Sequence, residues 1–349
     1  MIIECSNCTK KFKIQEDRLP QDKIVAFPCK NCGEKIRLDL RIGQTIKEQS
    51  LEPDHSGTKL AQTPPLTAAE TDDKSLKDKI LKSVKELPPM PQVIIKTQEV
   101  ISDSKADAKK IAEVIETDQS IATKVLKVAN SAYFGMGGKI SSISHASVVL
   151  GHKTLEEIVT LAGAEGILGG KLPGYGYDSK DLWKHSLAVA FASKIIANSK
   201  NPGLVKEAHM TGLIHDVGKI ILDDYIVEKK AEMESFMEKE EKTFFEAESQ
   251  YLGFNHADIA SDVCKKWNFP ESIYIAIKHH HQPGGSDGNE LCYILHMADY
   301  IATLSGIGYD SDDILYELEE GTMDYLNFSN ENVSEIVLKV TESVNKISV

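Results

Sequence analysis

The chain has 349 residues, of which 41% are hydrophobic and 27% charged, so it can bury a full hydrophobic core, but it has no run of about eighteen apolar residues that would suit a transmembrane helix. The first residues lack the basic and apolar regions of a secretory signal, and we therefore expect a cytoplasmic protein without membrane association. The net charge is −13, and because the first 42 residues hold nine Lys and Arg against six Asp and Glu, the residues after 42 carry −16. So acidic a body argues against nucleic acid as a partner.

Two Cys-x-x-Cys pairs lie in the N-terminal segment, residues 1–42: Cys5 with Cys8, and Cys29 with Cys32. In a reducing compartment this spacing favours metal ligation over disulfide bonds. Four thiolates suit tetrahedral zinc, and a module of about 40 residues is too small to fold without it. We expect a small zinc ribbon with β-hairpins, in which residues 12–14 and 36–38 are strands; a redox-active dithiol is the less favoured alternative.

This N-terminal segment resembles a zinc-ribbon family that is common at the front of bacterial regulatory proteins. The resemblance implies bound Zn²⁺ and leaves the surface that the ribbon contacts open. The next segment, residues 43–76, is polar, has no aromatic residue and contains Pro64-Pro65. Such a composition cannot supply a core, so we expect a flexible tether.

After the tether the sequence shows helical periodicity. Apolar residues recur at intervals of three and four in residues 107–115, and Asp118 can cap a second helix. Gly151 is typical of a helix end, while Thr154 and Glu157 have the spacing of a capping box.

Further helices are expected at residues 182–198, 205–223, 229–241, 256–267, 273–280, 291–304 and 331–347. No alternating strand pattern and no repeat of fixed period occurs among them. Residues 77–349 therefore predict a compact, all-α, multi-helix domain. Trp183 and Trp267 are expected to anchor its core, and Cys264 and Cys292 to be buried thiols.

Eight of the eleven histidines fall between His185 and His296. They include His185 and the pair His215-Asp216, and Asp299 follows His296 by three residues. This H…HD…D order resembles the metal-ligand order of HD-type phosphohydrolases. The resemblance implies that His185, His215, Asp216 and Asp299 ligate one divalent cation. Two imidazoles and two carboxylates suit an octahedral ion such as Mn or Fe better than tetrahedral zinc.

Further histidines extend the resemblance to the binuclear HD-GYP phosphodiesterases. It implies that His256, His279 and His280 hold a second metal, with Asp216 as the bridge. Lys219 lies three residues after Asp216, on nearly the same helix face, where it is expected to contact a phosphate. The Gly-Tyr-Pro signature of that family is missing, because Gln-Pro-Gly-Gly follows the histidines. This departure weakens the case for a cyclic dinucleotide bound by that loop.

The region upstream of these histidines resembles the HDOD domain. The resemblance is carried by the stretches Leu87-Pro-Pro-Met-Pro91, Ile115–Ile121, Lys124–Gly135, Ile143–Ala146 and Leu150-Gly151. It covers about residues 77–285 and implies a signal-transduction output domain related to HD hydrolases, many of which have lost the metal ligands that this sequence keeps. Read from the residues alone, Asn130 and Ser131 end a helix, with a left-handed cap at Asn130 and a packing role.

Three functions are compatible with these features. The first is a regulatory module that binds a protein signalling partner or a phosphorylated or nucleotide ligand, with a retained metal that stabilises the helices. The second is a metal-dependent phosphohydrolase or phosphodiesterase acting on a nucleotide or cyclic dinucleotide, in which Asp216 and Lys219 are catalytic. The third, a transcription factor acting through the ribbon, is disfavoured by the acidic body.

Overall fold

The computed structural model separates the chain into two units, Met1–Thr67 and Ala68–Val349. It describes residues 2–4, 11–13, 24–28, 35–39, 77, 80, 96–97, 99–101, 107–136, 138–308 and 317–347. The four N-terminal cysteines and the expected tether, residues 43–76, lie outside the described residues. Their predicted roles, and the predicted boundaries at residues 42 and 76, stay predictions.

The N-terminal unit contains two antiparallel hairpins. Strand β1 (Ile2–Glu4) pairs with β2 (Lys11–Lys13), and β3 (Ile24–Pro28) pairs with β4 (Lys35–Asp39). The strands expected near residues 12–14 and 36–38 correspond to β2 and β4. In the sequence, each Cys-x-x-Cys pair falls between the two strands of one hairpin.

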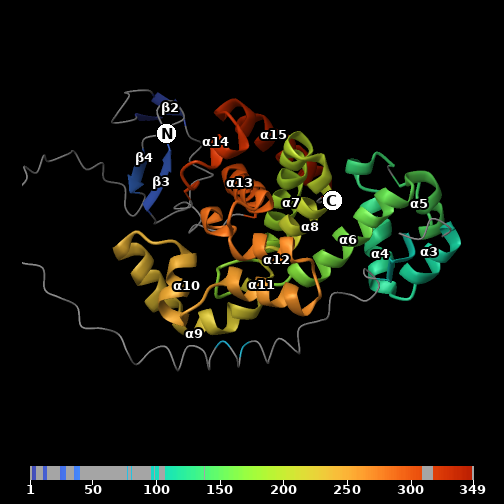
Figure 1. Cartoon of the computed structure of the whole chain (residues 1–349), viewed down its shortest axis with the longest axis horizontal. Helices are drawn as coiled ribbons and strands as arrows, with labels where there is room; N and C mark the ends of the chain where they lie inside the picture. Colours follow the sequence, from blue (N-terminus) through green and yellow to red (C-terminus); the bar gives the residue numbers. More distant parts are fainter. Residues whose placement is uncertain are drawn as a thin grey trace, which may run out of the picture. The chain divides into compact units, whose positions relative to one another are not determined.

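The described part of the second unit is helical (Figure 1). Its α-helices are α3 (Ala108–Ile115), α4 (Gln119–Ala129), α5 (Ile143–Leu150), α6 (His152–Leu168), α7 (Asp181–Lys200), α8 (Val205–Ile214), α9 (Val217–Glu240), α10 (Phe244–Leu252), α11 (His256–Lys266), α12 (Glu271–Lys278), α13 (Glu290–Ser305), α14 (Thr322–Leu326) and α15 (Asn330–Ile347). Short 3₁₀ helices lie at η3 (Ala132–Phe134), η4 (Pro202–Leu204) and η5 (Pro283–Ser286). The predicted all-α domain is confirmed, although α10 and α14 were not predicted.

Helix α7 lies at the centre of the core. It packs against α8, α13 and α15, while α3, α4 and α5 form a group next to α6 (Figure 1). Its residues 185–193 are all buried, as expected for a helix that is enclosed on every side. Trp183 is buried on the same helix and Trp267 packs half-buried against the core. Cys264 and Cys292 are buried thiols, as predicted.

Helix ends in the first part of the unit agree only partly with the predictions. Asp118 accepts the N–H of Ile121 and so caps α4, as expected. Gly151, at φ 79°, ends α5 and begins α6. The predicted capping box is wrong, because α6 already begins at residue 152 and Thr154 lies inside its first turn. Glu157 instead binds Lys194 at 2.6 Å.

The end of α4 is held by Asn130. Its φ of −89° is not left-handed, contrary to the expectation. Its side-chain Nδ2 donates to the carbonyls of Leu126 and Ile140, and its Oδ1 accepts the N–H of Ile140. The amide therefore closes the loop of residues 130–140 against the helix, which is a packing role.

Candidate metal centre

Three parts of the helical unit place the predicted ligands of the first cation side by side. His185 lies in α7, His215 and Asp216 lie at the junction of α8 with α9, and Asp299 lies in α13. Gly212 allows α8 to approach α7, since a Cβ added there would stand 2.9 Å from the α7 backbone. We call these four side chains the first cluster.

The polar atoms of the first cluster lie within contact distance of one another. His185 Nε2 is 3.0 Å from Asp299 Oδ1 and 3.7 Å from Asp216 Oδ2. His215 Nε2 is 3.3 Å from Asp216 Oδ2 and 3.8 Å from Asp299 Oδ1. All four residues are at most 4% exposed. The structure thus brings together the four residues that the H…HD…D order singles out, and their role as ligands remains to be tested.

The junction of α8 and α9 directs the Asp216 side chain into the cluster. Periodicity predicted separate helices at 205–223 and 229–241, which is wrong, because the break falls at residues 215–216 and α9 continues without interruption beyond it. Asp216 is the N-cap of α9, yet its side chain accepts no backbone N–H of that helix. A capping Asp usually satisfies those donors. Here the carboxylate faces imidazoles instead.

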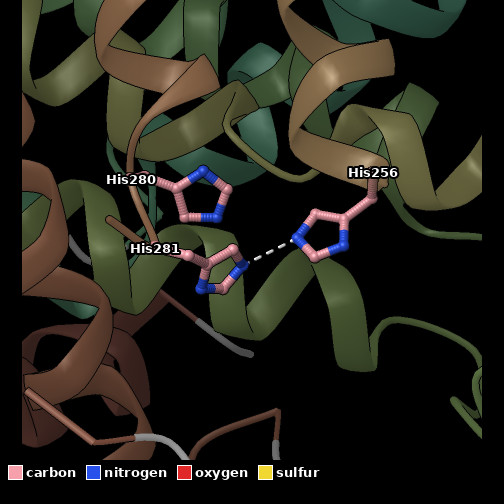
Figure 2. A group of neighbouring side chains, drawn as sticks. All are labelled: His256, His280 and His281. Carbon is pink, nitrogen blue, oxygen red and sulfur yellow. Dashed lines mark hydrogen bonds between the residues drawn. The ribbon is translucent and has the colours of Figure 1, made fainter. Parts of the chain in front are cut away.

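A second cluster lies against the other oxygen of Asp216. It consists of His256, at the start of α11, with His280 and His281, just after α12 (Figure 2). Asp216 Oδ1 is 3.4 Å from His256 Nε2 and 3.8 Å from His280 Nε2. His256 Nε2 is 2.9 Å from His281 Nε2. Gly218 permits this approach of α9 to α11, because a Cβ added there would overlap the carbonyl oxygen of His256.

Backbone carbonyls determine which ring nitrogens face the clusters. His215 Nδ1 lies 2.9 Å from the Gly212 carbonyl, and His280 Nδ1 lies 2.6 Å from the Ile277 carbonyl. Because a carbonyl only accepts, each Nδ1 carries a proton, and in the neutral form of either ring Nε2 presents a lone pair. Both Nε2 atoms and Asp216 Oδ1 are buried without a hydrogen-bond partner. Facing lone pairs and carboxylates repel one another unless a cation lies between them, so these residues fit divalent metal.

The ionisation of the clusters also suits a cation. Burial raises the pKa of Asp216, but His215 and Lys219 outweigh it and hold that pKa well below its ordinary value. The pKa of Asp299 is lowered as well, because an imidazole hydrogen bond outweighs burial. Burial lowers the pKa of His280 to about 3. The carboxylates are therefore charged and His280 is neutral at neutral pH, which are the forms that bind metal. Burial lowers the pKa of His215, but Asp216 and Asp299 outweigh burial and raise that pKa, so a metal bound there would displace a proton from its Nε2.

Lys219 lies at the edge of the first cluster. Its Nζ is 2.9 Å from Asp216 Oδ2. The ring centres of Tyr175 and Tyr177, in the loop between α6 and α7, lie 5.8 and 5.6 Å from the same Nζ. The amine thus sits between a carboxylate and two aromatic faces, and its predicted contact with a phosphate stays a prediction.

The structure places His281, and not the predicted His279, beside His256. His279 is partly exposed, ends α12 and faces Gly285. Histidines occupy all of positions 279–281, so residue type alone could not say which of them lies beside His256, and the predicted role of His279 as a ligand stays a prediction. Sequence reasoning also missed Glu248, whose carboxylate binds His256 Nδ1 at 2.8 Å. No local signal marked it, because Glu246, Ser249 and Gln250 make its surroundings in the sequence polar as well.

His296, the remaining histidine of the H-x-x-D stretch, contacts the backbone of His280 in the second cluster. Its Nδ1 lies 2.7 Å from the carbonyl of His280, and its Nε2 accepts the N–H of Glu319 at 2.8 Å. Both ring nitrogens therefore have partners, and the residue links the segment before α14 to the backbone of His280.

Comparison with known proteins agrees with this architecture. The family profile of the HDOD domain matches residues 87–283, and that of a zinc-ribbon domain matches residues 1–37. An uncharacterised protein of Treponema pallidum is 23% identical over 213 residues, which are 61% of this chain and 41% of that protein. The chain thus spans less than half the length of this curated relative.

Two solved structures share the fold. An HDOD domain protein of unknown function from Geobacter sulfurreducens has a TM-score of 0.62 and 24% identity, covering 80% of this chain and 96% of that one. A candidate phosphohydrolase from Shewanella amazonensis has a TM-score of 0.60 and 22% identity, covering 77% and 96%. In the described residues no helix is long and apolar enough to cross a membrane. The HDOD profile matches more than half of the chain, and the chain therefore belongs to the HDOD family.

Proposed function

We propose that the helical domain is a signal-transduction module whose conformation depends on a bound divalent cation and is recognised by a protein partner. The observation that carries this proposal is the first cluster, where buried lone pairs and carboxylates converge from α7, the α8–α9 junction and α13. A cation held there would link these segments. Its binding or loss would therefore change how the helices pack.

The second cluster supports a second cation. His256, His280 and His281 would supply imidazole nitrogens, and Asp216 would bridge the two positions through its separate oxygens. Imidazole and carboxylate donors together suit Mn, Fe or a similar divalent ion. The donor set is therefore the basis for expecting one of these metals here.

The N-terminal unit would add a second contact surface. The match to a zinc-ribbon domain at residues 1–37 supports Zn²⁺ bound by Cys5, Cys8, Cys29 and Cys32. Bound zinc would contribute on the order of 10 kcal/mol to folding of so small a module. A cobalt-substituted sample without thiolate absorption bands would contradict this assignment.

A phosphohydrolase is the second candidate, and Lys219 is the observation that favours it. Divalent cations in this centre would polarise a phosphoryl group. Asp216 would position them, and the Lys219 amine, 2.9 Å from Asp216 Oδ2, would contact a phosphate oxygen of a nucleotide or cyclic dinucleotide. Lys219 is only 8% exposed and the first cluster is at most 4% exposed, which favours the regulatory candidate because a substrate must reach the ions.

Metal content tests the first candidate. Wild type, His215→Ala and a control, His145→Ala on α5, would be incubated with Mn²⁺, desalted and assayed for bound metal and melting temperature. We expect His215→Ala to lose metal and stability together, because it removes one donor of the first cluster, and His145→Ala to match wild type. Unchanged metal stoichiometry in His215→Ala would contradict the assigned ligands.

Turnover separates the two candidates. Metal-loaded wild type and Asp216→Ala would be compared on a panel of nucleotides, cyclic dinucleotides and simple phosphomonoesters. Hydrolysis that disappears in the variant would establish the enzyme. Equal inactivity of both proteins, together with metal-dependent capture of one protein partner by the wild type alone, would establish the regulatory module.

A further inference from the structure

Glu248, on α10, is a fully buried carboxylate whose two oxygens both have partners. Oε2 accepts the backbone N–H of His256 at 2.6 Å and lies 2.8 Å from its Nδ1, and Oε1 lies 3.0 Å from that Nδ1. Oε1 also accepts the hydroxyl of Tyr175 at 2.7 Å. The carboxylate therefore holds both the backbone and the ring of His256, the first residue of α11.

This contact determines the tautomer of His256. A carboxylate only accepts hydrogen bonds, so Nδ1 carries the proton and the neutral ring presents the lone pair of Nε2. That lone pair points to Asp216 Oδ1, 3.4 Å away, and to His281 Nε2, 2.9 Å away. In metal sites, a carboxylate on the far nitrogen fixes the orientation of a histidine ligand and raises its basicity.

Tyr175 in turn fixes Glu248. The N–H groups of Gly174 and Tyr175 donate to Asp223 Oδ1 on α9, at 2.8 and 3.4 Å, which ties the loop to that helix. Burial and the Glu248 carboxylate raise the pKa of Tyr175 well above its ordinary value, so its hydroxyl stays a donor. A chain of buried hydrogen bonds thus runs from α9 through this loop and α10 to His256.

We propose that Glu248 is a positioning residue for the second cation, acting through His256, and that Tyr175 supports it. This inference rests on the proposed function, since it requires metal at the two clusters. Glu248 touches none of the residues of the first cluster in the contacts described. Its loss is therefore expected to weaken the second metal position selectively, by roughly 10- to 100-fold in affinity.

Manganese titration followed by electron paramagnetic resonance tests the proposal, because free Mn²⁺ can be counted at each addition. The proteins are full-length wild type, Glu248→Gln, Tyr175→Phe and the control Glu228→Gln, an exposed carboxylate on α9. We expect two ions in wild type and in the control. In Glu248→Gln the first ion should bind as before and the second about 10- to 100-fold more weakly, with a smaller loss in Tyr175→Phe.

A second measurement needs no metal. Proton–nitrogen correlation spectra of the histidine rings in metal-free wild type should assign the His256 proton to Nδ1, and Glu248→Gln should shift the ring toward the other tautomer. A proton on Nε2 in wild type would overturn the inference even if the variants fold poorly.

The outcomes separate the two proposals. No ion bound by wild type would refute the proposed function. Two ions in wild type, with both positions unchanged or both equally weakened in Glu248→Gln, would refute only the role of Glu248. A single ion in wild type that is lost in His215→Ala would also refute that role, and it would agree with metal at the first cluster.

Discussion

Replacing Gly218 by Ala should separate the two clusters. A Cβ at this position would overlap the carbonyl oxygen of His256 and would lie 2.9 Å from the carbonyl carbon and 3.0 Å from the Ala260 nitrogen. Unstrained carbon contacts are about 3.5 Å or more. Helix α9 must therefore move away from α11 by about 1 Å or more, which carries Asp216 away from His256.

Overpacking of this kind lowers the free energy of unfolding by about 1–3 kcal/mol. For a domain of this size that corresponds to a fall of roughly 2–4 °C in Tm per kcal/mol. The second metal position should weaken more than the first, because His185, His215 and Asp299 do not lie on α11.

The assay is thermal unfolding followed by circular dichroism, together with Mn²⁺ binding. Gly170→Ala is the matched control, because a Cβ there meets nothing within 4 Å and the backbone is not left-handed. Wild-type stability and full metal binding in Gly218→Ala would refute the reasoning, because the close approach of α9 and α11 would then not depend on this glycine.

Three further predictions follow from the described contacts. Burial lowers the pKa of His209 from 6.5 to about 4, so below pH 6.5 the unfolded chain binds more protons than the folded one and the free energy of unfolding decreases as the pH is lowered. Urea unfolding of wild type should lose stability between pH 8 and pH 5, and His209→Phe should reduce that loss by about 2 kcal/mol. Parallel pH curves for the two proteins would contradict this. Asn130→Ala should cost about 2–3 kcal/mol by urea unfolding, since the N–H and carbonyl of Ile140 lose their partner, and an unchanged midpoint would contradict a packing role. Mn²⁺ at 100 times its Kd should raise the free energy of unfolding by about 2.7 kcal/mol for each occupied position, and EDTA should reverse the increase. A Tm that changes with neither Mn²⁺ nor EDTA would contradict a metal site in the folded protein.

Much of the fold was predictable because the relevant signals are local. The cap at Asp118 and the end of α5 at Gly151 follow from side chains and backbone angles within one turn. The break between α8 and α9 was not predictable in the same way. Residues 215–216 are neither Gly nor Pro, so no local breaker marks the interruption between the two helices.

The candidate site shows the same division. The order of His185, His215-Asp216 and Asp299 predicted a set of residues that the structure brings together across three parts of the chain. The choice between His279 and His281 depends on where α12 ends, and helix ends are uncertain by one or two residues. Glu248 was missed because its partners lie on α11 and in the loop after α6, contacts that no periodicity encodes.

The most direct test of the account is a crystal structure of the protein grown with Mn²⁺ and measured at a wavelength that gives anomalous signal from manganese. The account predicts a peak within bonding distance, about 2.2 Å, of His185, His215, Asp216 and Asp299. A structure from such a crystal in which these side chains contact only one another or water, with no anomalous peak between them, would contradict the proposed metal site.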